Sequence, residues 1–376
     1  MKQFIYADNA ATTKLSPVAF EAMVPWLLDE YGNASQPYSF SRKPKKALTE
    51  ARAMIAECIG SDPEEIYFTS GGTESDNWAI KGTAFSRSTR SGALLTSAFE
   101  HHAVLKAAEA IETLLYPVAY MWPTNNGFIT LDILNRYITD ETRMVSVMMV
   151  NNELGTIQPI KELCEIAHKH GAIFHTDAVQ AVGHIPINVH ELGVDLLSAS
   201  AHKFNGPKGI GFLYIRKGTA IRPYSDGGAQ ESAMRAGTEN VASIMGMATA
   251  LVENCQSLNA NMDHITALER YLIDGLEESG IPYTRNAKAP YLPGLLSLSF
   301  KGYEGESILH RMDLAGIAIS TGSACDSVNT QISHVLQAIQ LDEKQAKGTI
   351  RISLGKNNTE DDIKEIIKAL QKIVKV

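Results

Sequence analysis

Ile66-Tyr-Phe-Thr-Ser-Gly-Gly-Thr-Glu-Ser-Asp76 is an apolar run that enters a glycine turn and then a helical pattern. This order predicts a buried strand, a tight turn and a helix, the repeating unit of an α/β fold. Free N–H groups at such a helix N-terminus can bind a phosphate, and the Thr73 hydroxyl would add a donor. Because no Gly-Lys-Ser/Thr follows, the turn is not a Walker A motif, and a plain strand-to-helix turn capped by Thr73 is an equal alternative.

The same alternation of short apolar runs and helical periodicity extends from Pro17 to about Leu251. The spacing favours a mostly parallel sheet. Buried strands are expected at 66–69, 93–96, 144–150 and 172–175. Further on, we expect a long polar helix over 248–279, β-rich stretches at 295–300, 317–320 and 349–354, and a closing helix over 360–374. The sequence therefore predicts a large domain over 15–256 and a smaller α+β domain formed by 1–14 and 257–376.

Composition limits the kinds of partner. The chain has 376 residues, 44% of them hydrophobic and 20% charged, which is typical of a folded globular protein. Its net charge of −8 argues against nucleic acid and anionic membranes as partners. Neither a signal peptide nor an apolar run of membrane-spanning length is visible, so a cytoplasmic protein is expected.

Asp177 and Gln180 follow the apolar run that begins at Ala172. Ligand sites of open α/β sheets lie at the carboxyl ends of the strands, so Asp177 is placed where it could meet a cationic group of a cofactor. A simple loop-capping role is the alternative for such an aspartate.

Lys203 lies at the end of another apolar run, beside His202 and a Gly-Pro-Lys-Gly turn. Lysine is rarely buried without a partner, and a lysine in this position is typical of an amine that forms an imine with a carbonyl group. A surface lysine that extends from the strand end is the alternative.

The four cysteines form no CxxC pair, which excludes a zinc cage or a disulfide framework. Cys58, Cys164 and Cys255 continue apolar helical faces and are expected in the core. Cys325 instead lies in a loop of small residues, which predicts an exposed thiol that can act as a nucleophile. An inert loop cysteine is the competing interpretation.

Histidines offer a rival interpretation, a metal-dependent hydrolase, because 100–102 and 168–177 contain several possible metal ligands. His168 and His170 have a simpler role, however. They fall in the last turn of a helix that Gly171 ends, where a cation meets the helix dipole favourably. No metal is therefore expected.

Motifs in a fixed order support a family resemblance. They are Asp8-Asn-Ala-Ala-Thr-Thr, Gly71-Gly-Thr-Glu-Ser-Asp-Asn, Glu100-His, Asn151-Asn-Glu-Leu-Gly, His175-Thr-Asp-Ala-Val-Gln, Ser200-Ala-His-Lys, Arg235-Ala-Gly-Thr-Glu-Asn and Gly322-Ser-Ala-Cys. The whole chain resembles the cysteine desulfurases, pyridoxal-phosphate enzymes of fold type I in the class V aminotransferase group. Its Gly-Ser-Ala-Cys loop resembles the branch that serves nitrogenase and iron–sulfur cluster assembly. The resemblance implies an α/β large domain with a mostly parallel, seven-stranded mixed sheet, a smaller α+β domain, and a homodimer.

Site roles follow from the resemblance alone. It makes Lys203 the lysine that binds the cofactor covalently, Asp177 the partner of the pyridine nitrogen, Gln180 the donor to the phenolate oxygen, and His101 the residue that stacks on the ring. The phosphate ligands would be Gly72, Thr73, Ser200 and His202, with Thr238 from a second subunit. Asn33, Asn152 and Arg351 would bind the substrate carboxylate, and Asn152 would also contact the cofactor.

The resemblance also implies the reaction. The Cys325 thiolate would attack the sulfur of L-cysteine, leaving L-alanine and a Cys325 persulfide for an iron–sulfur scaffold or another sulfur-acceptor protein. A selenocysteine lyase, a β-eliminating desulfhydrase and a catalytically silent scaffold are the alternatives. The sequence departs from the family pattern at Ser232-Ala233, where Arg-Gly is usual, and at Asp326, whose carboxylate disfavours the neighbouring thiolate.

Overall fold

A seven-stranded sheet forms the centre of the larger part of the protein, whose computed structural model describes residues 4–86, 91–321 and 332–374. The strand order is β2-β8-β7-β6-β5-β3-β4. The strands are β2 (Ile66–Thr69), β3 (Ala93–Ser97), β4 (Val118–Met121), β5 (Thr142–Ser146), β6 (Ile173–Asp177), β7 (Leu196–Ser200) and β8 (Gly211–Ile215). Strand β8 runs antiparallel to both β2 and β7, and all the other neighbouring pairs are parallel. The expected mostly parallel, mixed sheet is confirmed.

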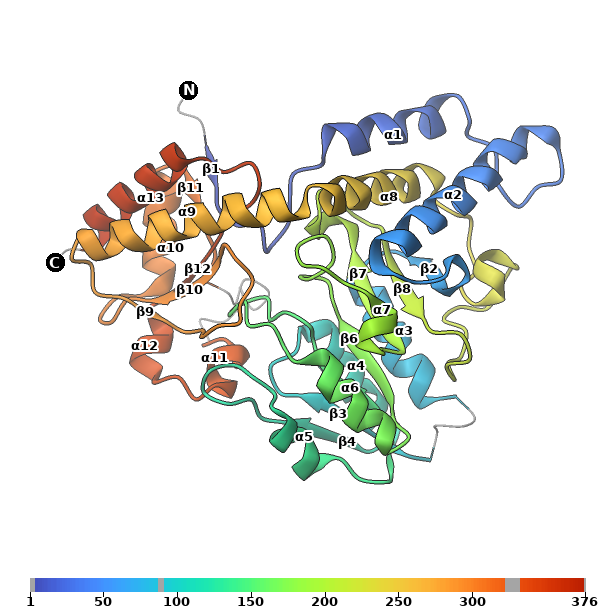
Figure 1. Ribbon diagram of the computed structural model, residues 1–376, viewed down its shortest axis with the longest axis horizontal. Coiled ribbons are helices and arrows are strands. Elements are labelled where there is room, and N and C mark those ends of the chain that lie inside the picture. Colours follow the sequence, from blue (N-terminus) through green and yellow to red (C-terminus); the bar gives the residue numbers. More distant parts are fainter. Residues whose placement is uncertain (1–3, 87–90, 322–331, 375–376) are drawn as a thin grey trace.

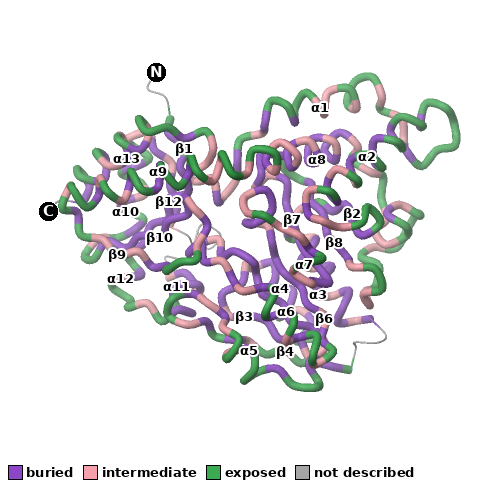
Figure 2. Tube along the Cα trace, viewed as in Figure 1, coloured by how far each residue is buried: buried purple, intermediate pink, exposed green. Residues whose placement is uncertain are grey.

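Successive residues of these strands face two different hydrophobic cores, because side chains alternate along a strand. Leu95 and Leu197 pack in one core with α2 (Arg42–Ile59), α6 (Ile160–Lys169) and α8 (Val241–Gln256). Leu94 and Leu196 pack in the other core with α3 (Gly72–Ala84) and α4 (His102–Glu112). Helices therefore cover both faces, which leaves the inner strands of the sheet largely buried, whereas the edge strand β4 is partly exposed (Figure 2).

Short or peripheral helices complete this part. They are α1 (Pro17–Leu28), α5 (Leu131–Tyr137) and α7 (Val189–Leu192). Helix α1 packs on α8 at the outer edge of the molecule (Figure 1).

A second group of elements has its own apolar core, which includes Leu272, Leu298 and Ile366. It contains an antiparallel sheet of order β12-β10-β9 and a parallel pair, β1 with β11. The strands are β1 (Ile5–Tyr6), β9 (Thr284–Arg285), β10 (Leu295–Ser299), β11 (Ile317–Ala318) and β12 (Thr349–Ser353). The helices that pack in this second core are α9 (Leu258–Glu278), α10 (Gly305–Leu314) and α13 (Glu360–Ile373). Two short helices, α11 (His334–Ala338) and α12 (Glu343–Lys347), instead place their buried apolar residues in the core of the large sheet. Through β1 the N-terminal segment starts in this group and then runs toward the large sheet.

The expected single helix over 248–279 is wrong. Helices α8 and α9 meet at Ser257, whose backbone (φ −101°, ψ 9°) departs from helical values, and the two lie end to end in Figure 1. Leu251 of α8 packs in the core of the large sheet, whereas Leu272 of α9 packs in the second core. The helical period is nearly continuous in sequence, but the two helices serve different cores, so the chain turns between them.

The expected strand over 144–150 is too long, because β5 ends at Ser146. Beyond it, the N–H of Met148 donates to the Glu100 carboxyl instead of a neighbouring strand, at 3.0 Å. None of the helices in the described ranges is both long and apolar enough to cross a membrane.

Candidate active site

A cavity of about 530 Å³ opens where β6 and β7 end. This volume suits a small-molecule ligand, since such sites commonly occupy about 300–1,000 Å³. Ten of the residues predicted for the site line it: Gly72, Thr73, His101, Asn152, Asp177, Gln180, Ser200, His202, Lys203 and Arg351.

One end of the cavity is the glycine turn at the start of α3. Gly71 has φ +144°, a conformation that favours glycine, and a Cβ atom on Gly72 would lie only 2.7 Å from the Val179 side chain. The backbone can therefore approach closely, with the first N–H groups of α3 unused by the helix itself. Thr73 and Ser200 add hydroxyl groups to this end, so it has the donor set that a phosphate requires.

Lys203 enters the cavity from a short 3₁₀ turn, Ala201–Lys203, directly after β7. Its Nζ donates hydrogen bonds to the carbonyl oxygens of Ala11, at 2.9 Å, and Ala10, at 2.5 Å. On the other side, His184 Nε2 donates to the Lys203 carbonyl oxygen at 2.8 Å. The amine is thus presented between the sheet and the N-terminal segment, as a covalent attachment point would be.

Asp177 ends β6 and is 4% exposed. Its Oδ1 accepts the Val179 N–H at 2.9 Å. Burial raises the pKa of Asp177 to about 6, against the opposing effects of that N–H and of the Lys203 ammonium. A cationic ring placed against Asp177 would lower this pKa and be stabilised in turn.

Two further carboxyl groups are buried near Asp177. Asp76, on α3, is 1% exposed, and burial together with the nearby Asp177 raises its pKa well above the usual value. Burial raises the pKa of Glu100 to about 8, although Met148 N–H donates to it. Of the three acids, Asp177 is the one whose negative charge the Lys203 ammonium stabilises, while burial favours the protonated forms of Asp76 and Glu100.

His175 lies behind these acids and is fully buried. Its Nδ1 is 2.8 Å from Ser146 Oγ, and its Nε2 is 3.0 Å from Ser198 Oγ. Burial lowers the pKa of His175 to about 3, so the ring is neutral and acts as a hydrogen-bonding link beneath the site.

His101 caps the N-terminus of α4, where its Nδ1 accepts the Ala103 N–H at 3.1 Å. Burial lowers the pKa of His101 to about 4, with Lys203, His102 and His334 acting in the same direction. Because Nδ1 is an acceptor, the neutral ring carries its proton on Nε2. His101 can therefore present a planar, uncharged face and a single N–H donor to a ligand.

The cavity is also lined by Arg351 of β12, which is 4% exposed. Its Nη1 donates to the Asn152 carbonyl oxygen and its Nη2 to Asp8 Oδ1, both at 2.8 Å. Within the described residues, Arg351 Nε and Asn152 Oδ1 are buried without a hydrogen-bond partner. Unsatisfied buried groups of this kind indicate a polar ligand, and a guanidinium suits a carboxylate.

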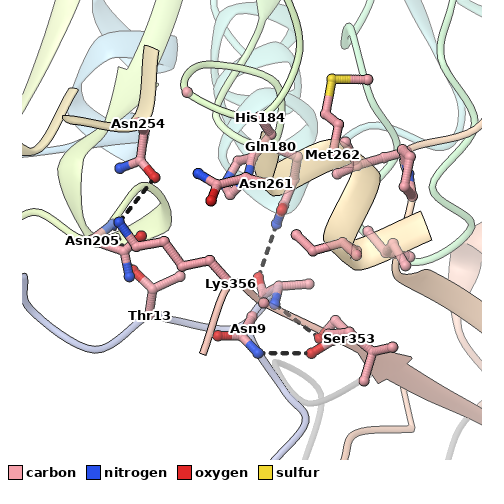
Figure 3. Close-up of a pocket in the computed structure, with 18 of the residues that line it drawn as sticks. Asn9, Thr13, Gln180, His184, Asn205, Asn254, Asn261, Met262, Ser353 and Lys356 are labelled. Atoms are coloured by element: carbon pink, nitrogen blue, oxygen red, sulfur yellow. Dashed lines mark hydrogen bonds between the residues drawn. The ribbon is translucent and has the colours of Figure 1, made fainter. Parts of the chain in front are cut away.

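Gln180 separates this cavity from a smaller one of about 60 Å³, shown in Figure 3. Its Nε2 donates to the Ala10 carbonyl oxygen at 2.9 Å. Asn9 and Ala10 are in turn bonded to Ser353, so the N-terminal segment is anchored to β12 at the smaller cavity (Figure 3).

Two predicted residues lie elsewhere in this chain, and a third falls outside the described residues. Thr238 is exposed, and Asn33 Oδ1 accepts the Ser35 N–H in a local turn at 2.9 Å. Neither lines the cavity within this chain. Cys325 lies outside the described residues.

The other cysteines and the histidines behave as structural residues. Cys164 is buried, and Cys58 and Cys255 are half-buried against the core of the large sheet, as expected. His168 is bonded to Asp195 at 2.8 Å. No group of three or more potential metal ligands converges within 4–86, 91–321 and 332–374.

Sequence reasoning missed several residues that form the cavity. Ala10 and Ala11 contribute carbonyl oxygens, Asp76 lines the wall, and Asp8 contacts Arg351. The only signal for the first two was their place in the Asp8-Asn-Ala-Ala motif, because alanine side chains suggest no chemistry.

A comparison with protein families matches residues 5–366 to the family described as aminotransferase class-V. The chain belongs to this family. It is 47% identical to "Cysteine desulfurase IscS" of Dictyoglomus turgidum over 375 residues, covering 100% of this chain and 95% of the relative. It is 43% identical to "Cysteine desulfurase IscS" of Clostridium botulinum over 379 residues, with the same coverage.

Solved structures agree with this class-V assignment. A "NifS-like protein" superposes with a TM-score of 0.93 at 35% identity, covering 99% of both chains. A NifS-like protein from Rickettsia africae gives 0.88 at 30% identity, covering 100% of both. The chain is thus a pyridoxal-phosphate-dependent enzyme of the class-V family, and it is similar over its whole length to cysteine desulfurases.

The residues that line the cavity have the chemistry that pyridoxal phosphate requires. The glycine turn, with no room for a Cβ on Gly72, suits the phosphate. Lys203 supplies the amine, and Asp177 supplies a buried anion for the pyridine nitrogen.

Proposed function

We propose that this enzyme is a cysteine desulfurase that uses Lys203, Asp177 and His101 around the cofactor, and passes the sulfur of L-cysteine to Cys325. The observation that carries the proposal is the meeting of a partly buried amine and a buried carboxyl in one cavity, next to an anion-binding helix start. Gly72, Thr73, Ser200 and His202 hold the phosphate, and Gln180 contacts the phenolate oxygen. Arg351 and Asn152 bind the substrate carboxylate.

When bound, pyridoxal phosphate supplies an electron sink for charge that develops at the substrate Cα. Asp177 keeps the ring nitrogen protonated, because an anion buried without a cation is unfavourable. Lys203, released from the cofactor, is the general base that removes the Cα proton. Neutral His101 lies against the ring and holds a proton on Nε2.

The Cys325 thiolate attacks the substrate sulfur, the carbon–sulfur bond breaks, and its electron pair stays with the three-carbon fragment. Protonation of that fragment gives L-alanine, while Cys325 holds the persulfide. No external oxidant or reductant is consumed until the persulfide is passed on.

A matched pair of variants tests the nucleophile. Cys325→Ala should bind the cofactor and show its visible colour, yet lose alanine formation from L-cysteine by at least about 100-fold. Cys255→Ser, which alters a half-buried cysteine on α8, should retain alanine formation. Continued alanine formation by Cys325→Ala would contradict the assignment, and pyruvate as the product would favour the β-eliminating alternative.

Homodimer formation is part of the proposal. Large apolar side chains are exposed on α1 and the segment that follows it, which marks an interaction surface. They are Val18, Phe20, Leu27, Leu28, Tyr31, Tyr38 and Phe40. A second copy covering this surface would also bring Thr238 to the partner's phosphate site. We propose that Asn33 reaches a substrate carboxylate only in such an assembly.

Mixing two inactive variants tests the shared site. Lys203→Ala and Thr238→Glu subunits, refolded together, should recover about one quarter of the activity, because half of the dimers are mixed and each has one intact site. Light scattering gives the mass of the assembly. A monomer, or a mixture without recovery, would contradict Thr238 acting across subunits.

The acceptor is proposed to be an iron–sulfur scaffold or another sulfur-acceptor protein. A free nucleophilic thiol requires a reducing compartment, which favours the cytoplasm. We propose that residues 15–256 form the large domain and that residues 1–14 and 257–376 form the smaller one. The segment that carries Cys325 would then belong to the smaller domain. Transfer of ³⁵S from labelled Cys325 to a purified scaffold protein tests the acceptor.

A further inference from the structure

Arg351 already faces an anion of its own chain. Its Nη2 lies 2.8 Å from Asp8 Oδ1, and its Nη1 lies 2.8 Å from the Asn152 carbonyl oxygen. The side chains of Arg351 and Asp8 are 5% and 17% exposed, so water screens this ion pair poorly. Two edges of the guanidinium are therefore occupied, and the edge at Nε is buried without a partner.

Asp8 is fixed beside Arg351 by the backbone on its two sides. Ser353 N–H donates to the Ala7 carbonyl oxygen at 2.8 Å, and Asn9 N–H donates to the Ser353 carbonyl oxygen at 3.1 Å. Ala10 N–H also donates to Ser353 Oγ at 2.9 Å. Ser353 and Arg351 lie two residues apart on β12, on the same face of the strand. The Asp8 carboxylate therefore stays near the guanidinium when a ligand arrives.

A substrate carboxylate at Arg351 would then share one cation with the Asp8 carboxylate. Two carboxylates that contact the same poorly screened guanidinium repel each other, and this repulsion opposes binding of the substrate carboxylate. Without Asp8, the buried guanidinium of Arg351 would lack an anionic partner. The site would therefore bind any small anion strongly.

We propose that Asp8 is a specificity-determining residue that weakens the binding of amino-acid carboxylates to Arg351. This inference rests on the proposed role of Arg351 as the carboxylate ligand. With Asp8 in place, a carboxylate alone is insufficient for tight binding, so retention depends on the amino group that bonds to the cofactor. The same effect favours release of the product L-alanine.

Binding of L-alanine to the holoenzyme, followed by the visible absorption of the cofactor, tests this directly. Asp8→Asn keeps an oxygen that can accept from Arg351 and removes the charge. It should lower the Kd for L-alanine about tenfold. The Kd for L-alaninamide, which lacks the carboxylate, should stay within about twofold of its wild-type value. Asp361→Asn, which removes a charge on the exposed face of α13, should change neither Kd.

An unchanged or higher Kd for L-alanine in Asp8→Asn would overturn the proposal and make Asp8 a partner that merely orients Arg351. If that variant does not fold, Asp8→Ser removes the same charge with a smaller side chain. Arg351→Gln tests the role of Arg351 as the carboxylate ligand separately from the role of Asp8. It should raise the Kd for L-alanine and not that for L-alaninamide, and if it does not, the role of Arg351 fails, whatever Asp8 does.

Discussion

The Nζ atom of Lys203 lies 2.9 Å from the carbonyl oxygen of Ala11, a residue 192 positions earlier in the chain. This contact joins the amine to the backbone of the N-terminal segment rather than to another side chain. The amine is therefore held in place by two neutral acceptors, Ala10 and Ala11, which neutralise none of its charge.

We predict that the cofactor is attached to Lys203. Borohydride reduction of the holoenzyme should attach the cofactor to Lys203, as read by mass spectrometry of its peptides. Lys203→Ala should abolish the label, whereas Lys208→Ala, an exposed lysine at the same cavity, should retain it. A label on Lys208 in the wild-type protein would refute the assignment.

Two neighbouring aspartates should respond differently to the same substitution. Asp177→Asn removes the anion that stabilises a protonated ring nitrogen and should lower kcat by at least about 100-fold. Burial and the nearby Asp177 raise the pKa of Asp76 and favour its protonated form, so Asp76→Asn should keep kcat within about threefold. Steady-state kinetics at pH 7 check both, and equal losses in the two variants would contradict the division of charge.

Glu100 should make stability depend on pH. Its pKa is raised to about 8 in the folded apoprotein, so unfolding releases a proton between the ordinary pKa of glutamate and pH 8. Its contribution to stability is therefore full below pH 4.5 and is lost as the pH rises to about 8. Glutamine at position 100 cannot titrate. From pH 5 to 8, the free energy of unfolding of Glu100→Gln should therefore fall by at least about 1 kcal/mol less than that of the wild type.

Denaturant unfolding of the apoprotein at pH 5, 6, 7 and 8 measures this difference. Glu191→Gln, an exposed acid on α7, is the control and should follow the wild-type profile. Parallel profiles for Glu100→Gln and wild type would show that Glu100 is ionised in the folded protein.

Ala233 should be improved by glycine. Its φ is +62°, and Glu231 and Ser232 before it also have positive φ. A Cβ atom is disfavoured there, so Ala233→Gly should stabilise the protein by about 0.5–1 kcal/mol. Ala260→Gly, at an exposed position within α9, should destabilise it by about 1 kcal/mol. Thermal melting distinguishes the two, and a lower melting temperature for Ala233→Gly would contradict the prediction.

Much of the fold and part of the site could be predicted from local signals. The run from Ile66 to Asp76 specified its strand, turn and helix, because apolar alternation, glycine and helical period act within a few residues. Asp177 and Lys203 were found at strand ends for the same reason. The break at Ser257 was missed, because nothing local distinguishes α8 from α9 except the core that each one faces.

The sequence by itself determined the α/β class, the order of the elements and the residue types that can perform imine and thiol chemistry. Only the tertiary structure decided which carboxyl group bears the charge, since burial and neighbours set the pKa values of Asp76, Glu100 and Asp177. It also decided that Asp8 meets Arg351, 343 residues away. Such a pairing depends on the backbone contacts of Ala7 and Asn9 with Ser353, which bring the N-terminal segment to β12, and no local pattern encodes those contacts.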